Sequence, residues 1–191
     1  MLDRGVWLNE PAQWSRKGDA LSVTTDRASD FWRETLYGFT RDSGHFLGVP
    51  TPGEFTAQVR VRADYQQLYD QAGLMVRLDE RHWVKTGVEF TDGARMLSTV
   101  VTSERSDWSV CTPAGDPGDL FLRVTVAKGA LRIQASLDGR VWPLLRLAPF
   151  PGADRYLVGP MCCTPERAGL FVEFLEFAIS APTTKDLHDL S

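Results

Sequence analysis

Apolar and polar residues alternate with a period of two in short runs along most of the chain. Gly, Pro and Asp-Gly separate these runs, and no stretch of helical length keeps apolar residues at the 3.6-residue period of a helix. The pattern predicts strands over residues 54–63, 71–78, 82–90, 95–102, 120–127, 130–137, 141–147, 156–161 and 169–180. About ten strands are too many for one open sheet, so we expect an all-β fold of two antiparallel sheets packed face to face.

We expect one domain over residues 1–181. At 191 residues, folding can remove roughly 70% of the unfolded chain's surface from water, which allows a sizeable core without a disulfide or a metal. Proline-rich pieces at 49–53, 113–117 and 149–152 are each too short to separate two cores, so they are interpreted as loops. The tail 182–191 is expected to fray.

The dipeptide Asp92-Gly93 lies between two alternating runs and predicts a tight hairpin, because a type I′ turn needs positive φ at both central positions. This turn fixes the pairing of 82–90 with 95–102, and a short loop at 79–81 then pairs 71–78 with 82–90. The side chains of this meander that are predicted to face the core are Ala72, Leu74, Val76, Val84, Val88, Phe90, Leu97 and Val101.

The opposite face of the meander is predicted to carry four cross-strand rows. They are Gln71, Glu89 and Met96; Gly73, Gly87 and Ser98; Met75, Lys85 and Val100; and Arg77, Trp83 and Thr102. Strand glycines often mark the close approach of a ligand or another backbone, so Gly73 and Gly87 are expected to floor a groove. Valine at position 87 should then leave the fold intact. The alternative is that the glycines accommodate a crossing loop or a bulge and that Lys85 and Glu89 form a surface ion pair.

Charge, cysteine content and the lack of long apolar runs indicate which partners and which compartment to expect. Lys and Arg number 21 against 25 Asp and Glu, so the net charge of −4 has the wrong sign for binding nucleic acid or an anionic membrane. Cys111 and the adjacent Cys162 and Cys163 do not suggest a disulfide framework. With no signal-peptide pattern and no apolar run of about 18 residues, we expect a soluble cytoplasmic protein.

Several motifs together resemble one known family. Residues 69–77 read YDQAGLMVR, residues 83–93 read WVKTGVEFTDG, and residues 106–109 read SDWS. Upstream, residues 30–35 read DFWRET, followed by Tyr37-Gly38 and Gly44-His45-Phe46. These motifs resemble the bacterial and fungal proteins often labelled "regulation of enolase protein", a domain of unknown function. The resemblance implies a concanavalin A-like lectin/glucanase jelly-roll sandwich with a concave face, and it implies no established reaction.

The polar residues of these motifs fall on the face of the meander assigned away from the core, where we expect a ligand. Trp32, Trp83 and Trp108 are candidate platforms for a sugar ring, because aromatic faces attract the C–H patches of sugars. Tyr37 and His45 precede the first long strand and are expected to reach over the groove. The candidate ligand-binding residues are Tyr37, His45, Gln71, Gly73, Trp83, Lys85, Gly87, Glu89, Ser98 and Trp108.

Metal and cofactor chemistry has little support in the sequence. His45, His82 and His188 lack the spacing of metal ligands, and Cys162-Cys163 is not a C-x-x-C site. No phosphate loop, dinucleotide fingerprint or nucleophile triad is present. We therefore expect no metal and no cofactor.

Three classes of function are compatible with the predicted face. The leading hypothesis is a protein that binds a saccharide or a similar polyhydroxylated small molecule. The second is a carbohydrate-active enzyme with Glu89 as acid/base and Lys85 or His45 as its partner. Glycoside hydrolysis needs a second carboxyl group, for which the candidates are Asp70, Asp107 and Glu173. The third is a protein-interaction or regulatory domain that uses the same face. The oligomeric state is left open.

Overall fold

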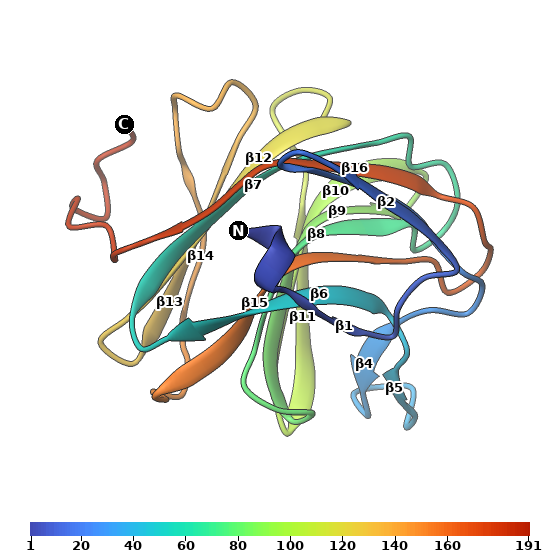
Figure 1. The fold of residues 1–191 in the computed structure, drawn as a ribbon, viewed down its shortest axis with the longest axis horizontal. Coiled ribbons are helices and arrows are strands. Elements are labelled where there is room, and N and C mark those ends of the chain that lie inside the picture. Colours follow the sequence, from blue (N-terminus) through green and yellow to red (C-terminus); the bar gives the residue numbers. More distant parts are fainter.

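Two seven-stranded antiparallel sheets form the molecule, which the computed structural model describes from Met1 to Ser191 (Figure 1). In sheet A the strand order is β1-β6-β15-β8-β9-β10-β11. Its strands are β1 (Val6–Leu8), β6 (His45–Pro52), β15 (Arg155–Cys163), β8 (Gln71–Arg77), β9 (His82–Thr91), β10 (Ala94–Ser103) and β11 (Arg105–Cys111).

In sheet B the strand order is β14-β13-β12-β7-β16-β3-β2. Its strands are β14 (Leu144–Pro149), β13 (Ala130–Ser136), β12 (Asp119–Ala127), β7 (Phe55–Ala63), β16 (Phe171–Ser180), β3 (Ala20–Thr24) and β2 (Gln13–Lys17). A separate hairpin consists of β4 (Phe31–Arg33) and β5 (Thr40–Asp42), and a short 3-10 helix covers Leu2–Arg4. The molecule contains no helix with the length and hydrophobicity of a membrane span.

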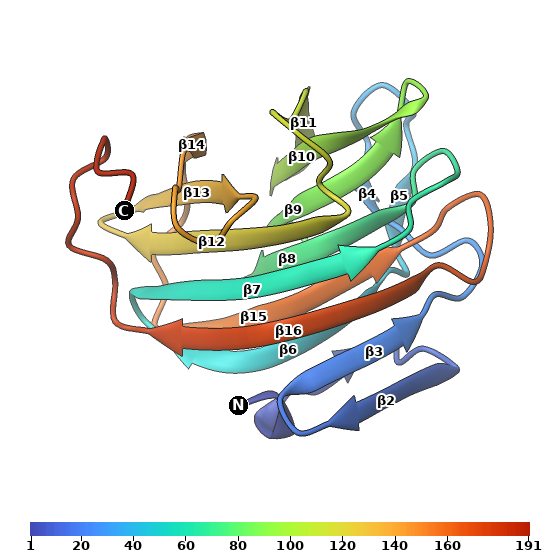
Figure 2. The ribbon, with the colours of Figure 1, turned by 90° about the horizontal axis from the view of Figure 1, so that it is seen from above.

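The two sheets enclose the main apolar core, as the alternating pattern predicts. Figure 2 shows strands of sheet B lying over strands of sheet A. The predicted inward side chains of the meander take part in this core, five of them fully buried and Phe90, Leu97 and Val101 partly buried against it. The all-β two-sheet sandwich expected from the sequence is therefore confirmed.

The predicted register of the meander is also confirmed. Glu89 lies between Gln71 and Met96, and Lys85 lies between Met75 and Val100. The turn residues Asp92 and Gly93 have φ of 53° and 74°, as a type I′ turn requires. All four expected rows consequently lie on the face of sheet A turned away from sheet B.

Strand β6 includes Pro50 and Pro52, in a stretch that was expected to be a loop. These prolines pair with Leu157 and Arg155 of β15 on one side, whereas on the other side β1 covers only Phe46 to Gly48. At the prolines β6 is therefore an edge of the sheet, where the missing N–H of proline is tolerated.

The C-terminal tail, expected to fray, lies against sheet B. The backbone N–H of Trp142 donates a hydrogen bond to the carbonyl of Leu190 at 2.8 Å. The Arg132 guanidinium donates to the carbonyls of Lys185 and Leu187 at 3.0 and 3.2 Å. These contacts hold the tail along the outer side of the sandwich.

A second apolar cluster covers part of the outer face of sheet A, beneath the β4–β5 hairpin. Phe31 and Trp32 of β4 pack there with Met75, Trp83 and Val100 of the sheet. The remaining buried members of this cluster are Phe46, Met161 and Cys163. Arg77 and Asp42 fasten the base of the hairpin through two hydrogen bonds of 2.7 and 2.8 Å. The hairpin thereby stands over the outer face of sheet A and encloses a pocket against it.

Candidate functional site

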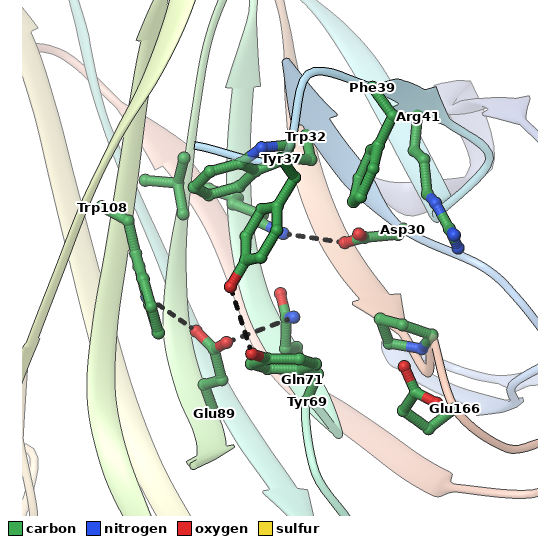
Figure 3. Close-up of a pocket in the computed structure, with 13 residues that line it drawn as sticks. Asp30, Trp32, Tyr37, Phe39, Arg41, Tyr69, Gln71, Glu89, Trp108 and Glu166 are labelled. Atoms are coloured by element: carbon green, nitrogen blue, oxygen red, sulfur yellow. Dashed lines mark hydrogen bonds and ion pairs between the residues drawn. The ribbon is translucent and has the colours of Figure 1, made fainter. Parts of the chain in front are cut away.

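A pocket of about 200 Å³ lies between the outer face of sheet A and the β4–β5 hairpin (Figure 3). Side chains from β8, β9 and β10 form its floor, and its walls come from the hairpin, from β11 and from the segments before β8 and after β15. The lining residues are Asp30, Trp32, Tyr37, Phe39, Arg41, Tyr69, Gln71, Lys85, Glu89, Val100, Trp108, Pro165 and Glu166.

Glu89 lies at the bottom of this pocket and is 4% exposed. Its Oε2 atom accepts hydrogen bonds from Ser98 Oγ at 2.5 Å and from Trp108 Nε1 at 3.1 Å. Its Oε1 atom receives only Gln71 Nε2, at 3.5 Å. Burial raises the pKa of Glu89, against the opposing effects of Lys85 and of the hydrogen bonds from Ser98 and Trp108. One carboxyl oxygen is thus held by the protein and the other is available to a ligand.

Lys85 and Asp30 form a buried ion pair beside Glu89. The Nζ atom of Lys85 lies 3.3 Å from Oδ1 of Asp30, which also accepts the backbone N–H of Phe31 at 2.8 Å. Burial acts to lower the pKa of Lys85, but the charge of Asp30, together with Cys163 and Glu89, outweighs it and raises this pKa. Two ammonium hydrogens and Asp30 Oδ2 have no partner within the protein, so the pair offers both donors and an acceptor to the pocket.

Aromatic side chains surround this polar floor. The Trp32 ring meets Trp108 and Tyr37 edge-on at centroid distances of 6.4 and 5.7 Å, and Tyr69 meets Trp108 at 6.4 Å. Tyr37 also stacks on Phe39 at 5.5 Å. Their indole and phenol edges and faces line the wall of the pocket.

At the rim of the pocket, the β4–β5 hairpin contacts the segment before β8. The hydroxyl of Tyr37 lies 3.5 Å from the hydroxyl of Tyr69, and this contact, followed by burial, raises the pKa of Tyr69 to about 12. Next to Tyr69 and Glu166 in the chain, Arg167 binds the buried carboxylate of Asp70 through two hydrogen bonds. This pair fastens the loop that carries Pro165 and Glu166 to the turn that carries Tyr69.

Five of the ten residues expected to bind a ligand line this pocket: Tyr37, Gln71, Lys85, Glu89 and Trp108. Ser98 lies behind Glu89 and donates to its carboxylate without lining the pocket. The other four, His45, Gly73, Trp83 and Gly87, lie away from it.

Gly73 and Gly87, expected to floor a groove, are not among the residues that line this pocket. A Cβ atom built on Gly73 would lie 1.9 Å from the carbonyl oxygen of Thr86, and one on Gly87 would lie 2.0 Å from that of Ala72. The two glycines face each other across β8 and β9 and allow the two strands to approach closely. These distances contradict the premise of the Gly87→Val prediction, because a side chain at position 87 would meet the backbone of β8.

Trp83 and His45 do not face the pocket, because each is buried among other parts of the protein. Trp83 is 1% exposed and packs against Phe31 in the cluster under the hairpin. Both ring nitrogens of His45 are occupied: Nδ1 contacts the carbonyl of Asn9 at 2.7 Å and Nε2 accepts the backbone N–H of Asp26 at 3.0 Å. Neither side chain lines the pocket.

The acids expected to pair with Glu89 are also committed elsewhere. Asp70 binds Arg167, Asp107 binds Arg146 at 2.7 Å, and Glu173 lies 3.7 Å from Arg62. Besides Glu89, the carboxylates that line the pocket are Asp30 and Glu166. Asp30 directly precedes the Phe-Trp pair of the upstream motif, and that position was the available signal for it. Glu166 carries no comparable signal.

Other residues of the site were missed because they come from segments without a strong strand pattern. They are Phe39, Arg41, Tyr69 and Pro165, whereas Val100 lies on the predicted strand β10 and was placed on this face but not among the ligand-binding residues. No group of three or more His, Cys, Asp or Glu side chains is arranged to hold a metal ion. What the site combines is an aromatic wall, a buried carboxyl group and a buried ammonium–carboxylate pair.

Comparisons with solved structures extend the description of the fold. A chain described as "The crystal structure of a functionally unknown protein from Saccharomyces cerevisiae" superposes with a TM-score of 0.94 at 58% identity, covering 95% of this chain and 98% of that one. "Bacteroides ovatus Xyloglucan PUL GH43B" matches with a TM-score of 0.70 at 19% identity over 93% of this chain and 36% of its own. The VIP36 exoplasmic/lumenal domain in its "Ca2+/Man3GlcNAc-bound form" matches with a TM-score of 0.56 at 10% identity, covering 99% of this chain and 88% of that one. These neighbours share the lectin/glucanase-like sandwich.

Sequence comparison identifies the family. The chain is 58% identical over 190 residues to "Regulation of enolase protein 1" of Saccharomyces cerevisiae, a match that covers 100% of this chain and 96% of that protein. The resemblance drawn from the motifs is therefore confirmed. Residues 7–182 match the family described as "Protein of unknown function (DUF1349)", and the chain belongs to this family.

Proposed function

We propose that this protein binds a saccharide in the pocket between sheet A and the β4–β5 hairpin. One observation carries the proposal: aromatic rings surround a floor on which a carboxyl group, an amide and an ammonium–carboxylate pair converge. Pockets that combine apolar walls with a few convergent polar groups are the usual form of small-molecule sites.

The chemistry of the site matches that of a sugar ring. A pyranose presents C–H groups that favour an aromatic face, and Trp32 and Trp108 supply such faces. Its hydroxyl groups each donate and accept a hydrogen bond. Lys85 supplies donors, and Asp30 Oδ2 and Glu89 Oε1 supply acceptors that the protein leaves largely unused.

The fold supports the proposal in a general way. The shared sandwich fold includes proteins described with the words "Xyloglucan" and "Man3GlcNAc-bound". We propose separately that the protein works in the reducing cytoplasm, because its three cysteines are free thiols and two of them are buried.

A thermal-shift and calorimetric screen of monosaccharides and short oligosaccharides tests the proposal. A ligand at about 100 times its Kd stabilises the folded state by about 2.7 kcal/mol, which for a chain of this size raises Tm by roughly 5–10 °C. Trp108→Ala should abolish the shift. Trp14→Ala is the matched control, because Trp14 is 42% exposed on β2 of the other sheet and contacts Trp7 and Glu10. Equal ligand binding by both variants would contradict the proposal.

A second candidate function is hydrolysis or transfer at the same sugar. The observation in its favour is that Glu89 is buried, has a raised pKa and keeps one oxygen free, which are properties of a general acid. Incubation with the ligands found in the screen, followed by product analysis, tests this candidate. Absence of any product while binding is intact favours the binding protein.

A further inference from the structure

The pocket is closed in two directions along the outer face of sheet A. Beyond Lys85 on the same face of β9, Trp83 fills the surface and packs against Phe31 at 6.1 Å between ring centroids. Toward β11, the edge-on contact of Trp32 with Trp108 forms a wall. A long chain lying on the sheet therefore cannot pass Trp83 along β9 or the Trp32–Trp108 contact toward β11.

The hairpin also covers the pocket from above. Tyr37 reaches across to Tyr69, so that two hydroxyl groups 3.5 Å apart lie over the floor (Figure 3). The remaining opening is bounded by Phe39 and Arg41 on the hairpin and by Glu166 on the opposite loop. A volume of about 200 Å³ is below the ~300–1,000 Å³ of sites for drug-sized ligands, and is suited to one ring.

The charges that line the pocket oppose one another. On the floor, the Lys85 ammonium is paired with the Asp30 carboxylate. At the rim, Arg41 and Glu166 carry opposite charges. Glu89 is buried among hydrogen-bond donors and holds its proton more tightly than an ordinary carboxyl group. A net charge on a ring that reaches the floor would lose its hydration without meeting a free counter-charge there, because Lys85 and Asp30 already compensate each other.

We infer that the pocket binds the single terminal ring of an uncharged saccharide, end-on, with any further rings leaving between Arg41 and Glu166. This inference rests on the proposed function and adds to it the orientation and the charge class of the ligand. Rings beyond the first contact only the rim, where contacts contribute little to affinity.

Competition experiments with chains of different length test the orientation. Glucose, galactose, mannose, xylose, arabinose and N-acetylglucosamine are first ranked by calorimetry. The best of them is then compared as linear di- to hexasaccharides and as its long linear polymer, at equal mass of sugar. End-on binding makes potency proportional to the number of chain ends, so a tenfold longer chain competes about tenfold more weakly.

The outcomes separate this inference from the proposed function. Potency at equal mass that is unchanged or increased for the polymer means binding within the chain, and overturns the end-on inference while leaving saccharide binding intact. Absence of binding by every sugar tested overturns both.

The charge class has its own test, which compares the best neutral sugar with the uronic acid and the amino sugar of the same configuration. We expect both charged sugars to bind at least about tenfold more weakly, because each buries an unpaired charge. Equal or tighter binding of either charged sugar overturns the neutral-ligand part of the inference.

Discussion

The ammonium of Lys85 and the carboxylate of Asp30, 3.3 Å apart, join strand β9 to the start of the β4–β5 hairpin. Their side chains are only 5% and 13% exposed. Removing one partner of a buried ion pair leaves the other charge buried without compensation. Removing both partners leaves no buried charge. The pair therefore connects the stability of the hairpin to the chemistry of the pocket.

We expect Lys85→Met to lower the free energy of unfolding by about 3 kcal/mol, because it leaves the buried Asp30 carboxylate uncompensated. The double variant Lys85→Met/Asp30→Asn should lose clearly less than the sum of the two single variants. Urea unfolding of all four proteins measures the coupling. Strictly additive losses would show that the two side chains do not interact in solution.

The raised pKa of Glu89 predicts a pH-dependent effect of Glu89→Gln on stability. Burial, opposed by Lys85 and by the hydrogen bonds from Ser98 and Trp108, makes the folded protein hold this proton more tightly than the unfolded chain. The stability that the proton contributes is complete below the ordinary pKa of 4.5 and is lost as the pH rises through the folded-state pKa. The glutamine variant does not titrate, so its stability relative to the parent protein should rise with pH over this window.

Urea unfolding at a series of pH values measures this difference. Glu166→Gln is the matched control, because Glu166 is an exposed carboxylate at the rim of the same pocket and shows no comparable burial. A difference between Glu89→Gln and the parent protein that stays constant or reverses with pH is inconsistent with a buried, raised-pKa carboxyl group.

The same Glu89→Gln variant separates a binding protein from an enzyme. In a binding protein, loss of a charged acceptor should weaken affinity by about 1–3 kcal/mol. In an acid/base enzyme the rate should fall by about 10²- to 10⁴-fold while ligand binding is nearly retained. Calorimetry and product analysis on one preparation distinguish the two patterns. If neither quantity changes, Glu89 has no role in ligand recognition.

Trp108→Phe should raise the pKa of Glu89 further, because phenylalanine cannot replace the indole N–H donated to Oε2 at 3.1 Å. Carbon-13 NMR titration of the Glu89 carboxyl measures the change, with Trp14→Phe as the control substitution in the other sheet. An unaltered titration of Glu89 in Trp108→Phe would show that the hydrogen bond is absent in solution.

Gly87→Ala is expected to lower the free energy of unfolding by about 3 kcal/mol or more, because its Cβ would lie 2.0 Å from the carbonyl oxygen of Ala72. Gly152→Ala is the control, since nothing lies within 4 Å of the added Cβ and the backbone there is not left-handed. It should change stability by less than about 0.5 kcal/mol. Similar stability of the two variants in urea would argue against the close approach of β8 and β9.

Local pattern was sufficient to predict the meander and its register. The two-residue turn at Asp92-Gly93 fixes one pairing, and a period of two assigns each side chain to a face once that pairing is known. Gln71, Lys85 and Glu89 could therefore be grouped on one face before any coordinates were considered.

The walls of the pocket could not be predicted in the same way. The hairpin strands are three residues long, and the connection between them contains left-handed residues, Glu34 and Leu36, that give no periodic signal. Its position over the sheet depends on packing between Phe31 and Trp83, which are far apart in the sequence. For the same reason Trp83 was expected to be available to a ligand, since its burial requires knowledge of what covers it.

The side chain of Trp32 belongs both to the apolar cluster under the hairpin and to the wall of the pocket. A substitution of Trp32 that favours a new ligand would also lower the stability of the fold, because any smaller side chain leaves a cavity beneath the hairpin. Tyr37, Phe39 and Arg41 extend beyond the cluster and are exposed, so substitutions there carry little cost in stability. Divergence of ligand preference among relatives should accordingly concentrate on these outer hairpin positions, while position 32 changes slowly.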